Sequence, residues 1–159
     1  MLFQAIDSGT GQAALQISGT VIVSRGRMHK LAELPGYCAV LDGKVHAAIY
    51  FCCRDEECEI VSLDSKTENI GAGSRLIELV VEEAARARCT RVWLITSNDN
   101  SKAIRFYQKR GFDLIAVHRE AITEARKLKP SIPLTGYDGI PVRHEVEFEY
   151  RLDYRENGE

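Results

Sequence analysis

The stretch IVSLDSKTENIGAGSRLIEL, residues 60–79, decides the fold of this chain. Residues 59–63 are mostly apolar and partly β-branched, as in a buried strand, and residues 64–69 are polar, as in a loop. Gly71 and Gly73 follow at the start of a strongly periodic helix. The stretch therefore predicts a strand, a glycine turn and a helix whose first amide groups have no partner within the helix.

Those backbone amides form a candidate anion site. The helix dipole adds partial positive charge at this end, and glycines allow a bulky group to approach the backbone. A phosphate or pyrophosphate would be held by the N–H groups of Ile70, Gly71, Ala72, Gly73, Ser74 and Arg75. A tight turn whose glycines only permit positive φ is the alternative, and two glycines alone do not separate these interpretations.

The composition indicates one globular domain over residues 1–159, with its core at about residues 20–152. Hydrophobic residues make up 45% of the chain, charged residues 28%, and the formal net charge is −2. This charge gives no drive toward nucleic acid, and the longest apolar run, residues 45–53, is too short to span a bilayer. We expect no nucleic-acid or membrane partner. No secretory signal is visible, so the expected location is cytoplasmic.

The five cysteines are odd in number and lack paired CxxC spacing. We expect reduced, mostly buried thiols, with no metal site and no disulfide framework. Cys89 ends a helix and does not begin one, so nothing there lowers its pKa as a nucleophile would need.

Before the glycine turn the chain is predicted to form an antiparallel meander. Three strands are expected at residues 37–41, 44–53 and 57–63, and Asp42-Gly43 favours a type I′ turn between the first two. Before these strands we expect a loosely structured arm at residues 1–19, a short strand at 21–23 and a solvated basic loop at 24–30.

After the glycine turn, helices and strands alternate. A helix at 71–88 is followed by an apolar strand at 92–96, which implies a parallel pair with the strand that ends at Leu63. The rest is expected as a helix from about Asn100 to Gly111, a strand at 112–117, a lid-like insertion at about 119–144 whose first residues are helical, and a half-exposed closing strand at 145–152.

Two separated motifs resemble those of the GCN5-related N-acetyltransferases, the GNAT family. The acetyl-CoA signature of that family, Q/R-x-x-G-x-G/A between a strand and a helix, is similar to ENIGAG at residues 68–73. A second family motif, N-x-x-A-x-x-x-Y-x-x-x-G-F, is matched by Asn100, Ala103, Tyr107, Gly111 and Phe112. The resemblance covers residues 44–117. It implies a mixed α/β fold of the α+β class, in which helices flank a mostly antiparallel sheet with one parallel, splayed strand pair.

The resemblance implies direct transfer of an acetyl group from acetyl-CoA to a primary amine of a small molecule or peptide. The pantetheine arm would pair with the strand edge at Val61 and Leu63, and a backbone N–H near Val61 would stabilise the oxyanion. The glycine turn would hold the pyrophosphate. Asn100 would either bind the cofactor or only cap its helix.

Two side chains are candidates for proton transfer by the same resemblance. Tyr107 would give a proton to the departing thiolate, although a core aromatic would show the same pattern. Glu59, expected on one strand face with Val61 and Leu63, would act as the base or position a water, with Glu57 behind it. An exposed carboxylate at the strand end is the alternative for Glu59.

Three departures from the family pattern concern the donor and acceptor sites. Glu68 stands where relatives have Gln or Arg, so Arg75 or Lys66 would compensate for its charge. The segment between the expected strands at 21–23 and 37–41 is short, where relatives have two helices, and the 119–144 segment is long; both would shape the acceptor pocket.

Two alternative functions and one oligomeric state are also considered. A non-catalytic acyl-CoA-binding regulatory module would keep the same fold. A Rossmann-type nucleotide site is disfavoured, because Leu76 stands at the third glycine of GxGxxG. A homodimer is expected through the late loop or the last strand.

Overall fold

The computed structural model describes residues 1–67 and 71–152. Glu68 to Ile70 of the glycine-turn motif lie outside the described residues. The strands are Leu2–Ala5 (β1), Val21–Ser24 (β2), Arg27–Lys30 (β3), Gly36–Leu41 (β4), Lys44–Arg54 (β5), Glu57–Ser65 (β6), Arg91–Ser97 (β7), Asp113–His118 (β8) and Glu145–Arg151 (β9). The helices are Gly11–Ser18 (α1), Ala72–Arg86 (α2), Ser101–Lys109 (α3) and Ala121–Leu128 (α4), with short 3-10 turns at Leu31–Glu33 (η1) and Tyr137–Gly139 (η2).

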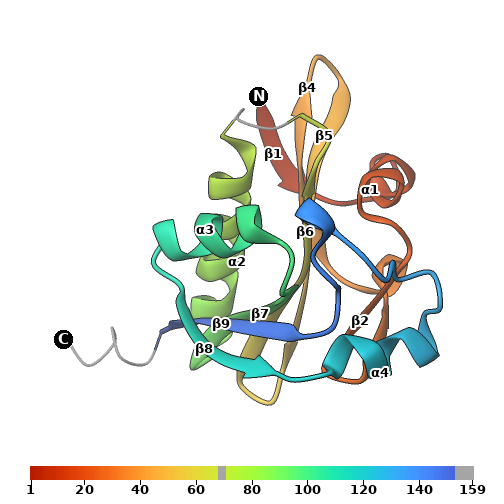
Figure 1. Cartoon of the computed structure of the whole chain (residues 1–159). Helices are drawn as coiled ribbons and strands as arrows, with labels where there is room; N and C mark the ends of the chain where they lie inside the picture. The colour runs from red at the N-terminus through yellow and green to blue at the C-terminus, as the bar shows by residue number, and fades with distance from the viewer. Residues whose placement is uncertain (68–70, 153–159) are drawn as a thin grey trace.

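A seven-stranded sheet in the order β1-β4-β5-β6-β7-β9-β8 forms the centre of the molecule. Helices α2 and α3 lie on one side of it, while α1, α4 and the β2–β3 hairpin lie on the other (Figure 1). The apolar stripe of α2, with Leu76, Val80 and Ala84, packs into the larger core cluster together with Leu94 of β7 and Phe148 of β9. The mixed α+β architecture expected from the sequence is confirmed.

Strands β6 and β7 form the one parallel pair among the described strands. Their pairing runs from Glu57 opposite Arg91 to Ile60 opposite Leu94 and stops there, although β6 continues to Ser65 and β7 to Ser97. The expected splayed pair is therefore present. The gap that opens beyond Ile60 is where the cavities described below meet.

A β-bulge at Val61 changes which side chains of β6 share a face. Tyr50 of β5 pairs with Ser62 and the next residue, Phe51, pairs with Ile60, so Val61 is the extra residue. Val61 packs with the cluster beneath α1, whereas Leu63 packs against the cluster beneath α2. The expectation that Glu59, Val61 and Leu63 share one face is wrong, because the inserted residue reverses the alternation.

The N-terminal segment is more ordered than the sequence suggested. Strand β1 pairs antiparallel with β4, and Ala14 of α1 is fully buried. The expected basic loop is instead the β2–β3 hairpin, in which His29 is buried. Both corrections have one cause, since these elements gain stability from partners far away in the sequence.

The last strand lies inside the sheet. β9 pairs with β7 on one side and with β8 on the other, and Glu145 to Phe148 are buried. The expectation of a half-exposed closing strand is therefore wrong, and the sheet edges are β1 and β8. The Asp42-Gly43 turn is as expected, with φ of 52° and 75° at its two residues.

Candidate active site

Two cavities lie on opposite sides of the sheet and share part of their wall where β6 and β7 diverge. The α3 cavity, about 710 Å³, lies between the start of α2 and the length of α3. The α4 cavity, about 390 Å³, is walled by the end of α1, by β2, by α4 and by the segment that follows it. Four residues line both cavities: Leu63, Asp64, Ala103 and Tyr107.

The glycine turn opens onto the α3 cavity, and each of its glycines has a structural reason. Gly71 caps α2 in the left-handed region, with φ of 79°. A Cβ at Gly73 would lie 3.0 Å from Phe106 Cζ, so glycine allows α3 to pack closely on the start of α2. The cavity wall includes Gly71, Ala72, Gly73 and Ser74. The first turn of α2 is thus accessible from this cavity, as an anion site at a helix N-terminus requires.

The positive charge in the α3 cavity comes from α3 and from Arg110, which caps its C-terminal end. Arg110 donates a hydrogen bond from Nε to Ser74 Oγ at 2.8 Å, and its Cζ lies 3.5 Å from the centre of the Phe106 ring. A guanidinium group is therefore held beside the first turn of α2. The cavity is also lined by Lys102, Arg105 and Lys109.

Sequence reasoning missed these α3 cations. Lys102, Arg105 and Lys109 are spaced three and four residues apart, and this spacing predicts a basic helix face. Arg75, the expected compensating charge, instead pairs with Glu78 at 3.1 Å and Glu82 at 3.4 Å on the exposed face of α2. Only the backbone of Arg75 remains near the glycine turn.

Asn100 caps α3. Its side-chain oxygen accepts a hydrogen bond from Ala103 N at 3.1 Å, which establishes the capping interpretation. The residue also lines the α4 cavity, so a contact with a ligand remains a prediction.

Tyr107 is buried at the junction of the two cavities. Its ring packs against Phe106, Phe112 and Phe148 and is 7% exposed. Burial raises the pKa of the Tyr107 phenol, and the nearby Asp64 carboxylate raises it further. The phenol therefore stays protonated near neutral pH and is available as a proton donor.

Val61 and Leu63 line the α4 cavity, on the part of β6 that has left β7. Leu63 also lines the α3 cavity. This strand edge, expected to receive an extended ligand, thus lies where the walls of the two cavities adjoin.

Glu59 is buried elsewhere on the sheet. Its Oε2 accepts a hydrogen bond from Ser24 Oγ at 2.6 Å, and its Oε1 lies 3.4 Å from His29 Nε2. Burial raises the pKa of Glu59 from 4.5 to about 7, and the nearby Glu145 acts in the same direction, against the Ser24 hydrogen bond. Burial, with Arg27 nearby, lowers the pKa of His29. A carboxyl group that titrates near neutrality suits a general base.

The structure does not bring Glu59 together with Tyr107. Glu59 lines a separate cavity of about 160 Å³, with Glu57 and Trp93, and not the cavities that Tyr107 joins. Glu59 lies on the same face of the sheet as the α4 cavity. The bulge at Val61 separates it from the end of β6 that no longer pairs with β7. The expected exposed position at the strand end is not observed either, because Glu59 is 7% exposed.

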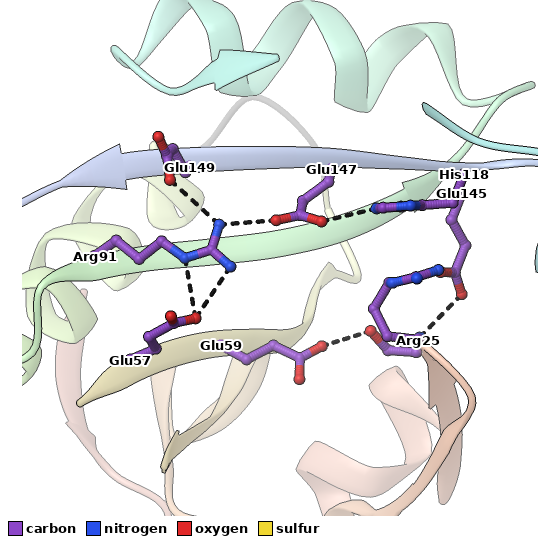
Figure 2. A network of polar contacts seen from close by, with 9 residues as sticks. Arg25, Glu57, Glu59, Arg91, His118, Glu145, Glu147 and Glu149 are labelled. Atoms are coloured by element: carbon purple, nitrogen blue, oxygen red, sulfur yellow. Dashed lines mark hydrogen bonds and ion pairs between the residues drawn. The ribbon is translucent and has the colours of Figure 1, made fainter. Parts of the chain in front are cut away.

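Glu59 belongs to a face of the sheet rich in carboxylates. Figure 2 shows Arg91 between Glu57 of β6 and the β9 side chains Glu147 and Glu149, at 3.0, 2.8 and 3.2 Å. Burial alone would raise the pKa of Glu147, but hydrogen bonds from Arg91 and His118 hold it below its ordinary value.

Arg25, at the tip of the β2–β3 hairpin, pairs with Glu145 at 3.1 Å (Figure 2). Glu145 is 1% exposed and lines the α4 cavity. The carboxylate face therefore reaches the α4 cavity at this residue.

The described part of the chain contains no cluster of histidine, cysteine, aspartate and glutamate suited to hold a metal ion. None of the described helices has the length and apolar character needed to cross a membrane. Cys38, Cys58 and Cys89 are buried thiols, whereas Cys52 is half-buried and Cys53 exposed.

Comparison with known proteins identifies the family. The model of the acetyltransferase (GNAT) family matches residues 17–112. Over 122 residues, 76% of each chain, the sequence is 45% identical to the uncharacterized protein YdhI of Bacillus subtilis (strain 168). The chain belongs to the GNAT family of acetyltransferases.

Solved structures share the fold. A Bacillus subtilis acetyltransferase in complex with CoA superposes with a TM-score of 0.66 at 22% identity, over 77% of this chain and 79% of that one. A GNAT family acetyltransferase from Elizabethkingia anophelis with acetyl-CoA bound gives a TM-score of 0.74 at 17% identity, over 95% and 97% of the two chains. At these identities the likeness shows the fold alone.

Proposed function

We propose that this chain transfers the acetyl group of acetyl-CoA to a primary amine of a small molecule or peptide by direct attack in a ternary complex. The observation that carries the proposal is that the α3 and α4 cavities share the wall residues Tyr107, Leu63, Asp64 and Ala103. A donor and an acceptor entering from opposite sides of the sheet would meet there. The bound acetyl-CoA in the Elizabethkingia relative supports the choice of donor.

The residues of the α3 cavity fit acetyl-CoA. Accessible amides at the first turn of α2 suit a pyrophosphate, and the cations of α3 supply the countercharge that Arg75 does not. The β6 edge at Val61 and Leu63 suits the amide groups of the pantetheine arm. When bound, acetyl-CoA supplies the activated acetyl group.

This chain's own residues would then position the groups and move protons. The bulge at Val61 interrupts the ladder with β5, so a backbone N–H in this part of β6 is our candidate for holding the thioester oxygen. Tyr107 would donate its phenol proton to the CoA sulfur as the bond to the acetyl group breaks. The amine proton would have to reach Glu59 through water, because Glu59 lines a cavity separate from the two that Tyr107 borders.

A calorimetric titration with acetyl-CoA tests the donor site. The variant R105E/K109E reverses two exposed cations that line the α3 cavity, so we expect it to bind at least about tenfold more weakly than the wild type. The matched control is K44E/K127E, which makes the same charge change at two exposed positions outside the cavities. It should bind like the wild type.

No binding by the wild type, or equal binding by R105E/K109E, would overturn the donor site. Transfer is then measured as release of the CoA thiol with a panel of primary amines. Saturable binding of acetyl-CoA without release for any amine would favour the non-catalytic acyl-CoA-binding module.

A further inference from the structure

We propose that the acceptor carries a second positive charge, as in a diamine or polyamine, and that Asp99 binds it in the α4 cavity. This inference rests on the proposed function and names the substrate class of the same site. It assigns to Asp99, two residues after the end of β7, the role of a specificity-determining residue.

Asp99 is a buried carboxylate with unused hydrogen-bonding capacity. It is 4% exposed and lines the α4 cavity. Its Oδ2 accepts a hydrogen bond from Tyr137 N at 3.1 Å, whereas its Oδ1 is buried with no hydrogen-bond partner among the described residues. A buried acceptor left without a donor is costly, and a ligand ammonium group supplies both the donor and the opposite charge.

Two other charged groups of the α4 cavity already have partners, and a third, Asp64, lies at the border with the α3 cavity. Glu145 accepts two hydrogen bonds from Arg25, one from its backbone and one from its side chain. Lys129 donates to Val21 O at 2.7 Å. Among the buried carboxylates that line the α4 cavity alone, Asp99 is therefore the one with an oxygen left for a ligand.

Asp99 is placed for a part of the acceptor other than the reacting amine. The transfer point is set by the residues shared between the two cavities, such as Tyr107, and Asp99 lines the α4 cavity only. An acceptor that fills this cavity would present one amine at Tyr107 and a second cationic group at Asp99.

The surroundings hold the Asp99 carboxylate in place. Gly136 packs so closely on it that a Cβ there would collide with Oδ2. Asn98 fastens the same segment to the end of β7, accepting hydrogen bonds from Arg143 N and His144 N, both at 2.9 Å. A rigid carboxylate loses little entropy when a ligand binds.

Asp99 could instead serve only to anchor the segment that contains Tyr137, through the hydrogen bond that it accepts from Tyr137 N. Asn in this position keeps an oxygen that accepts from Tyr137 N but removes the negative charge. D99N therefore separates loop anchoring from charge recognition. The matched control is D138N, which removes a charge from an exposed residue of the same segment; its φ of 55° suits Asn.

The test is a calorimetric titration of each protein with 1,4-diaminobutane, spermidine and 1-aminobutane. We expect the wild type to bind the diamine and spermidine at least about tenfold more tightly than the monoamine, since a charged hydrogen bond adds this much affinity. D99N should lose the difference, D138N should keep it, and a thermal melt should show D99N folded.

Equal affinity of the wild type for the three amines, no measurable diamine binding, or unchanged diamine affinity in D99N would overturn the inference. Acetyl transfer is measured in parallel. Transfer to monoamines and diamines alike, with no effect of D99N, would overturn the inference and leave the proposed function standing. Diamine binding that depends on Asp99, without acetyl transfer to any amine, would support the inference and overturn the proposed function.

Discussion

The two cavities on either side of the sheet are built in different ways. The α3 cavity takes its wall from short stretches within residues 63–67, 71–74 and 102–110, and combines backbone amides with cations. The α4 cavity takes its wall from α1, β2, β6, β7, α4 and the segment up to Glu145, and carries buried carboxylates. The proposed donor site is thus formed by a few short stretches, whereas the proposed acceptor site is assembled from distant parts of the chain.

The charges of the two cavities also differ in sign. Arg110, with the cations of α3, suits an anionic donor, while Asp99, whose Oδ1 has no partner among the described residues, suits a cationic acceptor. Tyr107 stands between them as the buried residue that borders both. The following variants test this division, beginning with the largest expected effect.

Tyr107→Phe tests the junction itself. Removing the phenol proton should lower kcat about a hundredfold or more, because a positioned general acid contributes this much. The affinity for acetyl-CoA should be unchanged, since the ring and its packing remain. Steady-state kinetics and calorimetry measure the two quantities, and an unchanged kcat would remove Tyr107 as the acid.

Glu59→Gln tests the carboxylate face through stability. The folded-state pKa of Glu59, about 7, lies above its ordinary value of 4.5, so the folded state holds the proton more tightly. Wild-type stability should therefore fall as pH rises from about 4.5 to 7, by up to about 3 kcal/mol. Gln cannot ionise, so the variant should be the more stable protein at pH 8, with the difference shrinking toward pH 5.

Urea denaturation at both pH values provides the measurement for Glu59. Glu33→Gln, at an exposed glutamate, is the control and should leave the pH dependence as it is. A Glu59→Gln protein that is less stable than the wild type at pH 8 would show that the Ser24 hydrogen bond outweighs the cost of burial.

Arg110→Ala and Arg75→Ala sharpen the account of the α3 cavity. Arg110 lines the cavity and contacts Ser74, so its loss should weaken acetyl-CoA binding about tenfold. Arg75 pairs with Glu78 and Glu82 outside the cavity, so its loss should change the affinity little. Calorimetry compares the two, and a larger effect at Arg75 would restore the assignment made from the sequence.

Asn100 gives the smallest expected effect. Asn100→Ala should lower the free energy of unfolding by about 1 kcal/mol through loss of the helix cap, while Asn100→Asp should preserve stability. If the Asn100 amide also contacts the cofactor, Asn100→Asp will weaken acetyl-CoA binding without destabilising the protein. Chemical denaturation and calorimetry on the same samples distinguish capping from binding.

Much of the second half of the fold could be predicted because its elements are long and periodic. The parallel β6–β7 pair, the α2 stripe and the Asn100 cap all follow from local patterns. Strand β1 could not be predicted, because its four residues become a strand only by pairing with β4. The bulge at Val61 could not be predicted for the same reason, since a register shift is a property of two paired strands and not of one strand.

The same distinction between local and long-range features applies to the candidate site. The sequence by itself determined the glycine turn, Tyr107 and the family to which they belong, because each depends on residues within a few positions of one another. Only the tertiary structure decided that Arg75 faces away, that Glu59 lies outside the cavities of Tyr107, and that Asp99 is buried beneath Gly136. Burial and charge pairing depend on segments far apart in the chain, and no local pattern encodes which of them will meet.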